Sequence, residues 1–406
     1  MDAGLALVPD DKYTALKDGL DKGVFIKSGN PNRDKMDAVS PIKNLNKTLY
    51  GRVWPGYAAF PDFTNPSGES YWIDQLTKFA EIIDYDGLWI DMNEIANFCT
   101  GACIPEDRLP FETSVLNKVI YTPGEVDLEE HSISLDGLHY DGHNELDHHS
   151  LFGYLQGKAT SKYFTEVKQK RPFIISRNTF TGSGHYVSHW NGDNFATWDF
   201  LEYSIIGTMN MNFFGVPLTG SDICGFMLDT NEDLCEKWTV VGAFYPFSRN
   251  HNALGAINQE PFFWSNKTAT NMKQAIQMKY SLLRYYYTQF WQIYSPYHNI
   301  STFYKPMFFE FPFSDLAYED IARNIMLGQA IKFSPNIHPY SPDVTEEQFF
   351  FPKGNWCNIF DGACIHADTD KYELLKIDPS HLNLHLREGW IIPKQESIEY
   401  NDLNVY

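Results

Sequence analysis

Short apolar runs alternate with amphipathic stripes over the first 300 residues. Two stripes recur at helical spacing and predict helices: Trp72, Leu76, Phe79 and Ile83 within 71–83, and Leu155, Ala159, Tyr163 and Val167 further on. Between them lie apolar runs at 88–90 and 172–176, which end at Asp91 and Arg177. An apolar run that ends in a charge is typical of a buried parallel strand that delivers a side chain to the rim of a sheet.

Other segments complete this pattern. Residues 11–22 predict a short helix, and 97–148 lose periodicity over a stretch too long for an ordinary connection, which indicates a functional rim loop. The run 230–233 is typical of a capping box in which Asp233 has a structural role, opening a helix with Leu234, Trp238 and Val241 on its inner face. Strands alternating with helices predict a parallel sheet.

The last third of the chain follows a different pattern. A long aromatic helix is predicted first, with its stripe in the core: Ile276, Tyr280, Leu283, Tyr287 and Phe290. After Tyr304, short alternating segments at 306–311, 348–352 and 382–386 are separated by Gly and Pro. These segments predict an antiparallel β-sandwich.

Composition narrows the possible functions. The chain has 406 residues, 43% apolar, which is enough for one large core and a second domain. Its 32 Lys and Arg against 52 Asp and Glu give a net charge of −20, which argues against nucleic acid or an anionic membrane as a partner. No run of 18 apolar residues predicts a membrane span, and the first residues do not resemble a signal peptide.

The cysteines and glycosylation sequons favour a secretory or lysosomal protein. Six cysteines fall in three close pairs, 99/103, 224/235 and 357/364, although spacing alone leaves their pairing open. Sequons begin at Asn46, Asn266 and Asn299.

Chemistry is concentrated in the run 84–100, where two carboxylates, Asp91 and Glu94, follow the apolar strand. The segment 89–94, Trp-Ile-Asp-Met-Asn-Glu, resembles the nucleophile signature of glycoside hydrolase family 31, the α-glucosidases. Further motifs occur in the family's order: Val-Trp-Pro-Gly at 53–56, Phe-Pro-Asp-Phe-Thr-Asn-Pro at 60–66, Arg-Asn-Thr-Phe at 177–180, His-Trp-Asn-Gly-Asp-Asn at 189–194, Gly-Ser-Asp-Ile-Cys-Gly-Phe at 220–226 and Phe-Tyr-Pro-Phe-Ser-Arg-Asn-His at 244–251. The resemblance covers essentially the whole chain.

The resemblance implies a (β/α)₈ TIM barrel over 1–304, with the rim insertion 97–148, followed by a β-sandwich over 305–406. It also implies that Asp2, Ala3 and Gly4 stand at the end of the third barrel strand. The amino-terminal β-domain and the first two barrel strands would then be missing, and the barrel would be incomplete at its amino-terminal side.

Glycoside hydrolysis needs one carboxylate to trap a positively charged anomeric carbon and a second acid to protonate the departing oxygen. The resemblance implies that Asp91 is the nucleophile, Asp193 the acid/base and Glu94 a supporting group. It assigns the remaining site residues as Arg177 and His251, donors to sugar hydroxyls; Asp222, an acceptor; and Trp54, Trp89, Met92, Trp190 and Phe226, apolar walls. It also implies a disulfide between Cys224 and Cys235.

Three departures from the family pattern are visible. Ile95 replaces the proline that usually follows Met-Asn-Glu, and Ser150 stands where an Asn is usual. The family's further acidic contact to the sugar lies on a strand that this chain would lack. A metal site is an alternative use of the histidines that crowd one loop, His139, His143, His148 and His149. A solvated loop is the better interpretation, because ligand spacing of this kind is loose and the family resemblance implies no metal here.

The predicted function is a retaining exo-α-glucosidase that releases terminal α-1,4-linked glucose from oligosaccharides without a cofactor or a metal. Alternatives on the same site are an α-xylosidase, a transglucosidase or a glucan lyase. A non-catalytic sugar-binding remnant is the alternative of a different class. The expected location is lysosomal or extracellular.

Overall fold

The computed structural model describes residues 2–8, 13–29, 45–101, 103, 121–122, 126–297 and 302–395. The sequon at Asn299 and most of the rim insertion between 102 and 125 lie outside the described residues. The chain forms two compact units, Met1–His189 and Trp190–Tyr406, and each has its own core.

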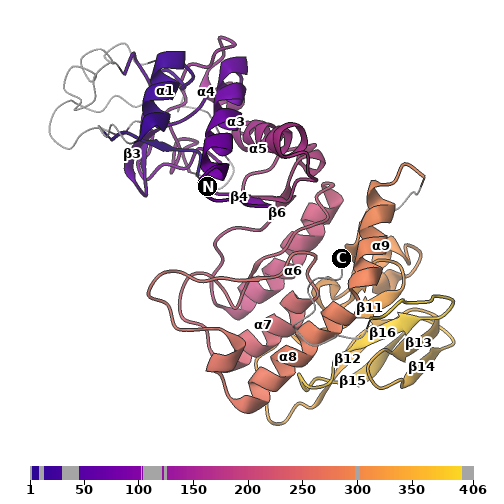
Figure 1. The fold of residues 1–406 in the computed structure, drawn as a ribbon. Coiled ribbons are helices and arrows are strands. Elements are labelled where there is room, and N and C mark those ends of the chain that lie inside the picture. Colours follow the sequence, from indigo (N-terminus) through magenta and orange to yellow (C-terminus); the bar gives the residue numbers. More distant parts are fainter. Residues whose placement is uncertain are drawn as a thin grey trace. The chain divides into compact units, whose positions relative to one another are not determined.

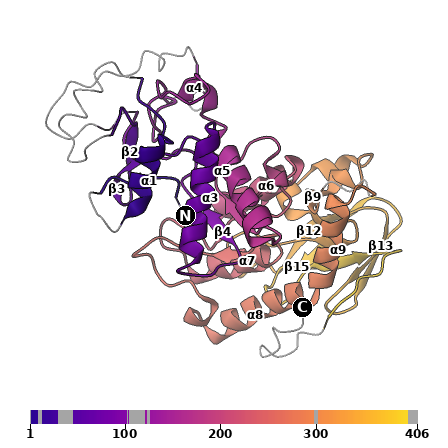
Figure 2. The ribbon, with the colours of Figure 1, turned by 45° about the horizontal axis from the view of Figure 1, so that its top comes forward.

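The first unit contains two small sheets and three main helices. Its antiparallel sheet has the order β1-β3-β2, and its parallel sheet has the order β4-β5-β6. In chain order the elements are β1 (Leu5–Ala6), α1 (Thr14–Lys22), β2 (Tyr50–Val53), β3 (Gly56–Ala59), α3 (Pro66–Ala80), β4 (Leu88–Ile90), α4 (Glu145–His148), α5 (Phe152–Lys162), a π-helical turn (Tyr163–Lys168), β5 (Ile174–Ser176), a 3₁₀ turn (Ser183–His185) and β6 (Ser188–His189). Figures 1 and 2 show α3 beside α5, as their many contacts require.

Helix α3 begins earlier than its apolar stripe predicts. Asn65 caps it by accepting a hydrogen bond from the Ser67 N–H, and Pro66 occupies the first turn, where its missing donor costs nothing. Trp72 is buried, and its indole donates to the Thr160 hydroxyl of α5 at 3.0 Å. Because the helix ends at Ala80, Ile83 lies beyond it and is 56% exposed, so its predicted place in the core is wrong.

The second unit combines α/β segments with antiparallel sheets. Its elements are α6 (Trp198–Phe213), β7 (Asp222–Ile223), α7 (Glu232–Ala243), β8 (Arg249–Asn250), a 3₁₀ turn (Pro261–Phe263), α8 (Asn266–Ser281), α9 (Leu283–Tyr294), β9 (Tyr304–Pro306), 3₁₀ turns at Met307–Phe309, Asp315–Tyr318 and Ile321–Arg323, β10 (Ile325–Leu327), β11 (Ile331–Phe333), β12 (Glu346–Phe351), β13 (Gly354–Asn358), β14 (Cys364–Ala367), β15 (Lys371–Lys376) and β16 (Leu384–Arg387). Strands β7 and β8 are parallel, and β9 to β16 pair only antiparallel.

Two apolar cores lie on opposite sides of the six-stranded sheet, whose order is β14-β13-β16-β11-β10-β9. One core joins this sheet to helices α6 to α9, through residues such as Trp238, Tyr286 and Phe333. The other joins it to the β12-β15 pair through Phe349, Phe351 and Trp356. The parallel segments and the antiparallel sheet domain agree with the predicted fold class (Figure 2).

Three local predictions in this unit are wrong. The cap of α7 is Asn231, which accepts from the Leu234 N–H, whereas Asp233 pairs with Lys237 at 2.7 Å. The aromatic helix is two helices separated at Leu282, and its stripe is not all core, since Tyr280 and Tyr287 are 47% and 65% exposed. The segment 306–311 is mostly a 3₁₀ turn instead of a strand.

All six cysteines form disulfides between the close neighbours seen in the sequence. The Cys224–Cys235 pair, implied by the family resemblance, joins the end of β7 to α7 with a Cα–Cα distance of 4.6 Å. Cys99–Cys103 follows β4, and Cys357–Cys364 links β13 to β14. Each short loop is thereby restricted in the unfolded chain.

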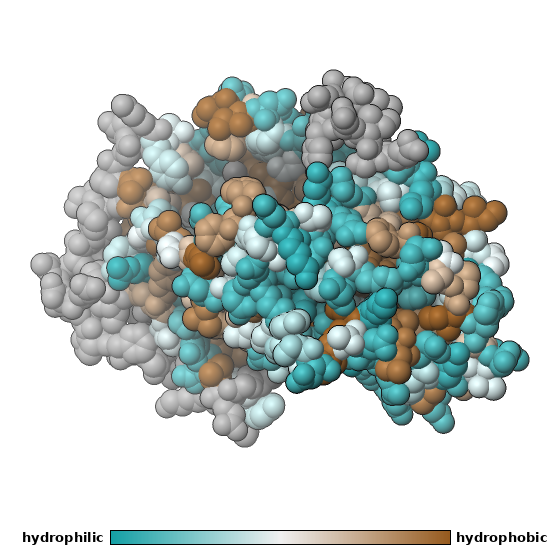
Figure 3. All heavy atoms as spheres, turned by 90° about the horizontal axis from the view of Figure 1, so that it is seen from below, coloured by the Kyte–Doolittle hydropathy of each residue, from teal (hydrophilic) through white to brown (hydrophobic). Residues whose placement is uncertain are grey.

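Polar residues cover most of the face shown in Figure 3, and apolar residues appear there in separate groups. Within the part of the chain that the structure describes, no helix is both long and apolar enough to cross a bilayer.

The core between the β-sheets buries two titratable side chains, Lys332 and His385, which face each other across β11 and β16. The Lys332 amine donates to Ser334 and lies 4.4 Å from the ring centroid of Phe351, and the His385 ring packs edge-on against the same Phe351. Burial lowers the pKa of both groups, that of His385 to about 3. This core therefore holds His385 neutral near pH 7.

We expect this neutral histidine to weaken the fold in acid. The unfolded chain binds a proton at His385 near pH 6.5, whereas the folded chain resists it until about pH 3, so stability falls as the pH drops through this range. At pH 5 the loss is about 2 kcal/mol. Urea unfolding at pH 7.5 and pH 5 should show a smaller pH difference for His385→Leu than for the parent.

The matched control is His131→Leu, because the His131 side chain is 78% exposed. This variant should keep the parent's pH difference. An unchanged pH difference in His385→Leu would contradict the assignment.

Candidate active site

In the first unit, two parallel strand ends bring the predicted nucleophile to an arginine. Strands β4 and β5 pair Ile90 with Ser176, so Asp91 and Arg177 follow next to each other. Arg177 Nη1 lies 3.2 Å from Asp91 Oδ1, and the same oxygen accepts from the Met92 N–H at 2.7 Å. The two interactions hold this oxygen of Asp91 in a fixed orientation.

The same arginine holds the second carboxylate of the segment. Its Nε and Nη2 donate to the two oxygens of Glu94, each at 2.9 Å, in a two-pronged pair. Glu94 thus fixes the plane of the guanidinium that faces Asp91. Its role as a supporting group stays a prediction.

Asn93 was not singled out from the sequence, yet it locks the two strand ends together. It is fully buried; its amide donates to Ser176 Oγ at 2.8 Å, and its side-chain oxygen accepts from the Asn178 N–H at 2.8 Å. Asn178 in turn donates to the Asn93 carbonyl at 3.0 Å. The sequence did offer a signal for these two residues, because Asn93 and Asn178 lie within the motifs at 89–94 and 177–180 that resemble the family.

Asp2 is a further carboxylate near this strand end. It forms an isolated parallel bridge with Asp91. Burial raises the pKa of Asp2, and the Asp91 charge acts in the same direction.

Apolar side chains surround this strand end. Trp89 precedes Asp91 on β4 and is 37% exposed, whereas Met92 is buried against Val53. Trp54, at the tip of the β2–β3 hairpin, is 75% exposed and packs edge-on against Phe98 with ring centroids 4.9 Å apart. Phe98 was missed from the sequence, where it stands alone in a segment without periodicity.

In the second unit, two asparagines fasten the loop that carries Asp193 to β7. Asn191 donates from its backbone to the Gly220 carbonyl at 2.9 Å and from its side chain to Ser221 Oγ at 2.7 Å. Asn194 donates to the Asp222 carbonyl at 3.0 Å and accepts from the Phe226 N–H at 2.9 Å. Asp193 lies exposed between these two anchors.

Gly225 allows the segment after β7 to pack closely against the Asp193 loop at Ala196. Its φ is +89°, and a Cβ at this position would lie 2.4 Å from the Ala196 backbone, so a larger residue would separate the two segments.

The remaining predicted side chains of this unit follow β7 and β8. His251 stacks on Phe226 with ring centroids 5.1 Å apart. Asp222 is fully buried and accepts at Oδ1 from Arg249, and the Arg249 guanidinium lies 5.0 Å from the ring centroid of Trp190. Arg249 was not singled out from the sequence. Among the predicted residues, contacts thus join Asp91, Glu94 and Arg177 in the first unit, and Phe226 and His251 in the second.

The histidine-rich loop is organised by ion pairs. His139 is buried, and its two ring nitrogens lie 3.1 Å from Asp62 and 2.8 Å from Glu145. His148 pairs with Asp141 at 2.8 Å. Among the described residues, no group of three or more His, Cys, Asp or Glu side chains is arranged to hold a metal ion.

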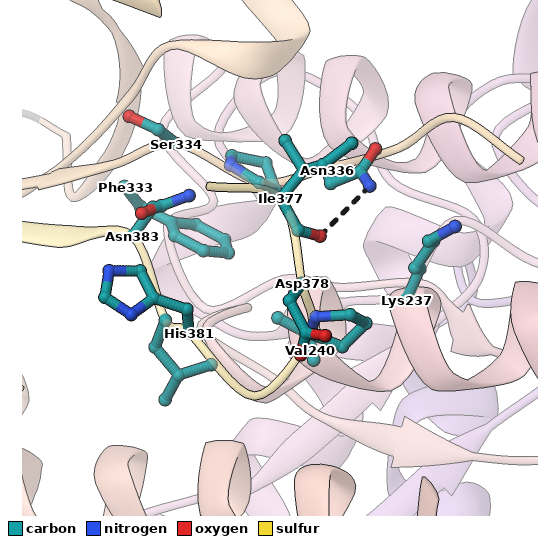
Figure 4. Close-up of a pocket in the computed structure, with 12 residues that line it drawn as sticks. Lys237, Val240, Phe333, Ser334, Asn336, Ile377, Asp378, His381 and Asn383 are labelled. Carbon is teal, nitrogen blue, oxygen red and sulfur yellow. Dashed lines mark hydrogen bonds between the residues drawn. The ribbon is translucent and has the colours of Figure 1, made fainter. Parts of the chain in front are cut away.

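The second unit contains a pocket between α7 and segments that follow β11 and β15 (Figure 4). Lys237 and Val240 of α7 line it together with the segments 333–336, 377–379 and 381–383, and Asn336 donates to the Ile377 carbonyl across it at 3.3 Å. Its lining shares no residue with the predicted catalytic and sugar-binding set.

Parallel strands with acidic, basic and aromatic side chains at their carboxyl ends define a protein of the α/β-barrel class. The TIM-barrel domain of glycosyl hydrolases family 31 matches residues 2–289, and the C-terminal domain of that family matches 301–392. The chain therefore belongs to glycosyl hydrolase family 31.

Individual members of the family are also similar to this chain in sequence. The lysosomal α-glucosidase of Mus musculus is 36% identical over 414 residues, covering 95% of this chain and 40% of that protein. α-Xylosidase 1 of Arabidopsis thaliana is 37% identical, covering 87% of this chain and 40% of that protein. The chain thus spans about two fifths of the length of these relatives. The fold resembles the glucosidase II α subunit, with a TM-score of 0.78 and 24% identity over 98% of this chain and 38% of that one.

We expect His139 to be essential to the stability of the rim loop. Burial opposes its charge, but hydrogen bonds to Asp62 and Glu145 outweigh this and raise the pKa to about 9. The stabilisation is therefore fully present below about pH 6.5 and is lost as the pH rises to 9. His139→Leu leaves two buried carboxylates without their cation and should destabilise the chain by about 3–5 kcal/mol, measured by urea unfolding at pH 6.

His143→Leu provides the control, since this side chain lies in the same loop and is 63% exposed. It should change stability by less than about 0.5 kcal/mol. Equal losses in the two variants would show that the buried ion pairs are not what stabilises the loop.

Proposed function

We propose that the protein is a retaining exo-α-glucosidase that releases glucose from the non-reducing ends of α-1,4-linked maltooligosaccharides or glycogen-type glucans. The observation that carries the proposal is the pairing of Asp91 with Arg177 and the Met92 N–H at the end of β4. This pairing orients the carboxylate within a family 31 barrel domain. The α-glucosidase names of relatives agree with this activity.

In the proposed mechanism, Asp91 attacks the anomeric carbon while Asp193 protonates the departing glycosidic oxygen. The resulting covalent glucosyl ester on Asp91 is hydrolysed by a water that Asp193 deprotonates, so the product keeps its configuration. The transition state resembles an oxocarbenium ion, which the anionic Asp91 stabilises. Asp193 serves first as acid and then as base.

Binding is proposed to use the other predicted side chains. Arg177 and His251 donate to sugar hydroxyls, and Asp222 is assigned as acceptor by the family resemblance. The flat walls against the pyranose are Trp54, Trp89, Met92, Trp190 and Phe226. Hydroxyl-pairing groups of this kind reject sugars that lack the matching hydroxyl.

Related activities share such a site. A relative of 37% identity is named an α-xylosidase, so an α-xylosidase is the second candidate. Three further alternatives are a transglucosidase, a glucan lyase and a non-catalytic sugar-binding remnant. Product analysis separates them: glucose of retained configuration, xylose, a transfer product, an unsaturated sugar, or no product.

The proposal also includes the domain limits, the partners and the cellular location of the protein. A catalytic barrel over 1–304, with the rim insertion 97–148, precedes a β-sandwich over 305–406. The net charge of −20 argues against a nucleic-acid partner, and no cofactor is needed for the chemistry. The cysteine pairs and the lysosomal relatives favour a secretory-pathway location, lysosomal or extracellular.

The nucleophile can be identified by trapping. A cyclitol epoxide that mimics glucose should esterify Asp91, and fragmentation of the labelled peptide should place the mass on this residue. Asp91→Asn should abolish labelling. Asp86→Asn should not, because that carboxylate is exposed and pairs with Lys170. A label on Glu94 in the parent protein would overturn the assignment.

The acid/base can be identified by leaving-group dependence. Asp193→Ala should slow maltose hydrolysis by roughly 10²–10⁴-fold and should affect an activated aryl α-glucoside far less, since only maltose needs protonation to depart. Asp199→Ala is the control, an exposed aspartate at the start of α6. Equal losses on the two substrates would mean that Asp193 only binds or packs.

A further inference from the structure

Arg249 occupies a position between two parts of the candidate site. It stands opposite Asp222 in the register of β7 and β8, and its Nε and Nη2 donate to Asp222 Oδ1 at 2.8 and 2.6 Å. Two N–H groups on one oxygen fix the orientation of the guanidinium plane. Asp222 is fully buried, so Arg249 contacts it out of reach of solvent.

The guanidinium also contacts an aromatic ring. Its carbon lies 5.0 Å from the centroid of the Trp190 ring, within the range of an attractive cation–π interaction. Trp190 directly precedes Asn191, the first anchor of the loop that carries Asp193. The orientation of the ring and the start of the loop are therefore linked to Arg249.

The carboxylate of Asp222 is thus committed to a side chain of its own chain. Its main-chain carbonyl holds the second anchor, Asn194, at 3.0 Å. Asp222 therefore fixes the end of the Asp193 loop through its backbone carbonyl, which holds Asn194. It fixes the start of this loop through Arg249, which contacts Trp190. A contact between the buried carboxylate and a sugar hydroxyl is not needed to explain its presence.

We propose that Arg249 is a positioning residue which, held by Asp222, orients Trp190 and the Asp193 loop for protonation of the leaving group. This inference rests on the proposed function and reassigns Asp222 from sugar acceptor to anchor of Arg249. Lysine cannot replace arginine here, because a single ammonium cannot both donate twice to one oxygen and lie flat against the ring.

Kinetics of Arg249→Lys test the role in protonation. Its kcat/KM should fall about 10- to 100-fold on maltose, mainly in kcat, and less on 4-nitrophenyl α-glucoside, because a misplaced acid matters most for the poor leaving group. In an Asp193→Ala background the same substitution should have little further effect on maltose. Equal losses on the two substrates, or full additivity with Asp193→Ala, would overturn the proposal.

Arg323→Lys is the matched control. Arg323 also pairs with a carboxylate, Glu347 at 2.6 Å, and its guanidinium lies 4.6 Å from the ring centroid of Phe349. However, it belongs to the antiparallel sheet domain that contains β9 to β16. This variant should lower the melting temperature without changing the ratio of the two kcat/KM values. A changed ratio in Arg323→Lys would reduce the effect to general destabilisation and overturn the proposal.

A second readout needs no activity. With 5-fluorotryptophan incorporated, the ¹⁹F resonance that disappears in Trp190→Phe belongs to Trp190. It should shift in Arg249→Lys and in Asp222→Asn and stay in place in Arg323→Lys. If the parent hydrolyses neither substrate, the proposed function fails, and the resonance still decides whether Arg249 orients the ring; an unshifted resonance overturns the inference.

Discussion

The interaction on which the first half of the site depends is the contact of one guanidinium, that of Arg177, with two carboxylates, Asp91 and Glu94. Two acids three residues apart repel each other unless a cation lies between them. A parallel neighbour strand is the simplest way to bring that cation, because strands in register end at the same edge. Asn93 then prevents the two ends from sliding.

The second unit holds its loop with asparagine hydrogen bonds in addition to the Arg249–Asp222 pair. The Asp193 loop carries its acid on the exposed side, and Asn191 and Asn194 satisfy backbone groups that a rigid loop would otherwise leave unpaired. The two halves of the predicted site are thus held by different means: one arginine with two carboxylates at Asp91, and asparagine hydrogen bonds around Asp193.

Sequence reasoning found the parts of the site that have a local signature. Apolar runs ending in charge predicted β4 and β5, and motif resemblance named Asp91, Arg177 and the family. It missed Arg249 and Phe98, whose importance lies in contacts across elements: Arg249 reaches Asp222, 27 residues away, and Phe98 packs against the hairpin tip at Trp54.

Helix boundaries show the same division between local and tertiary information. The stripe of α3 predicted its buried face at Trp72 and Leu76, but the start was set by a cap at Asn65 outside the stripe. The exposed Tyr280 and Tyr287 show that helical periodicity reveals which residues share a face without revealing what covers it.

The departure at Ile95 illustrates how this loop tolerates a change in the family motif. Its φ is +55°, which a proline, fixed near −65°, cannot adopt, so the chain here must follow a path that the usual proline would forbid. A β-branched residue in this conformation costs about 1–2 kcal/mol. Ile95 is fully buried, and the rim loop holds its carbonyl through Ser132 and the next turn through a bond from the Asn97 N–H to the His131 carbonyl. Burial and these bonds offset the strain, and they do so four residues beyond Asp91, so that the contact between Asp91 and Arg177 is left untouched.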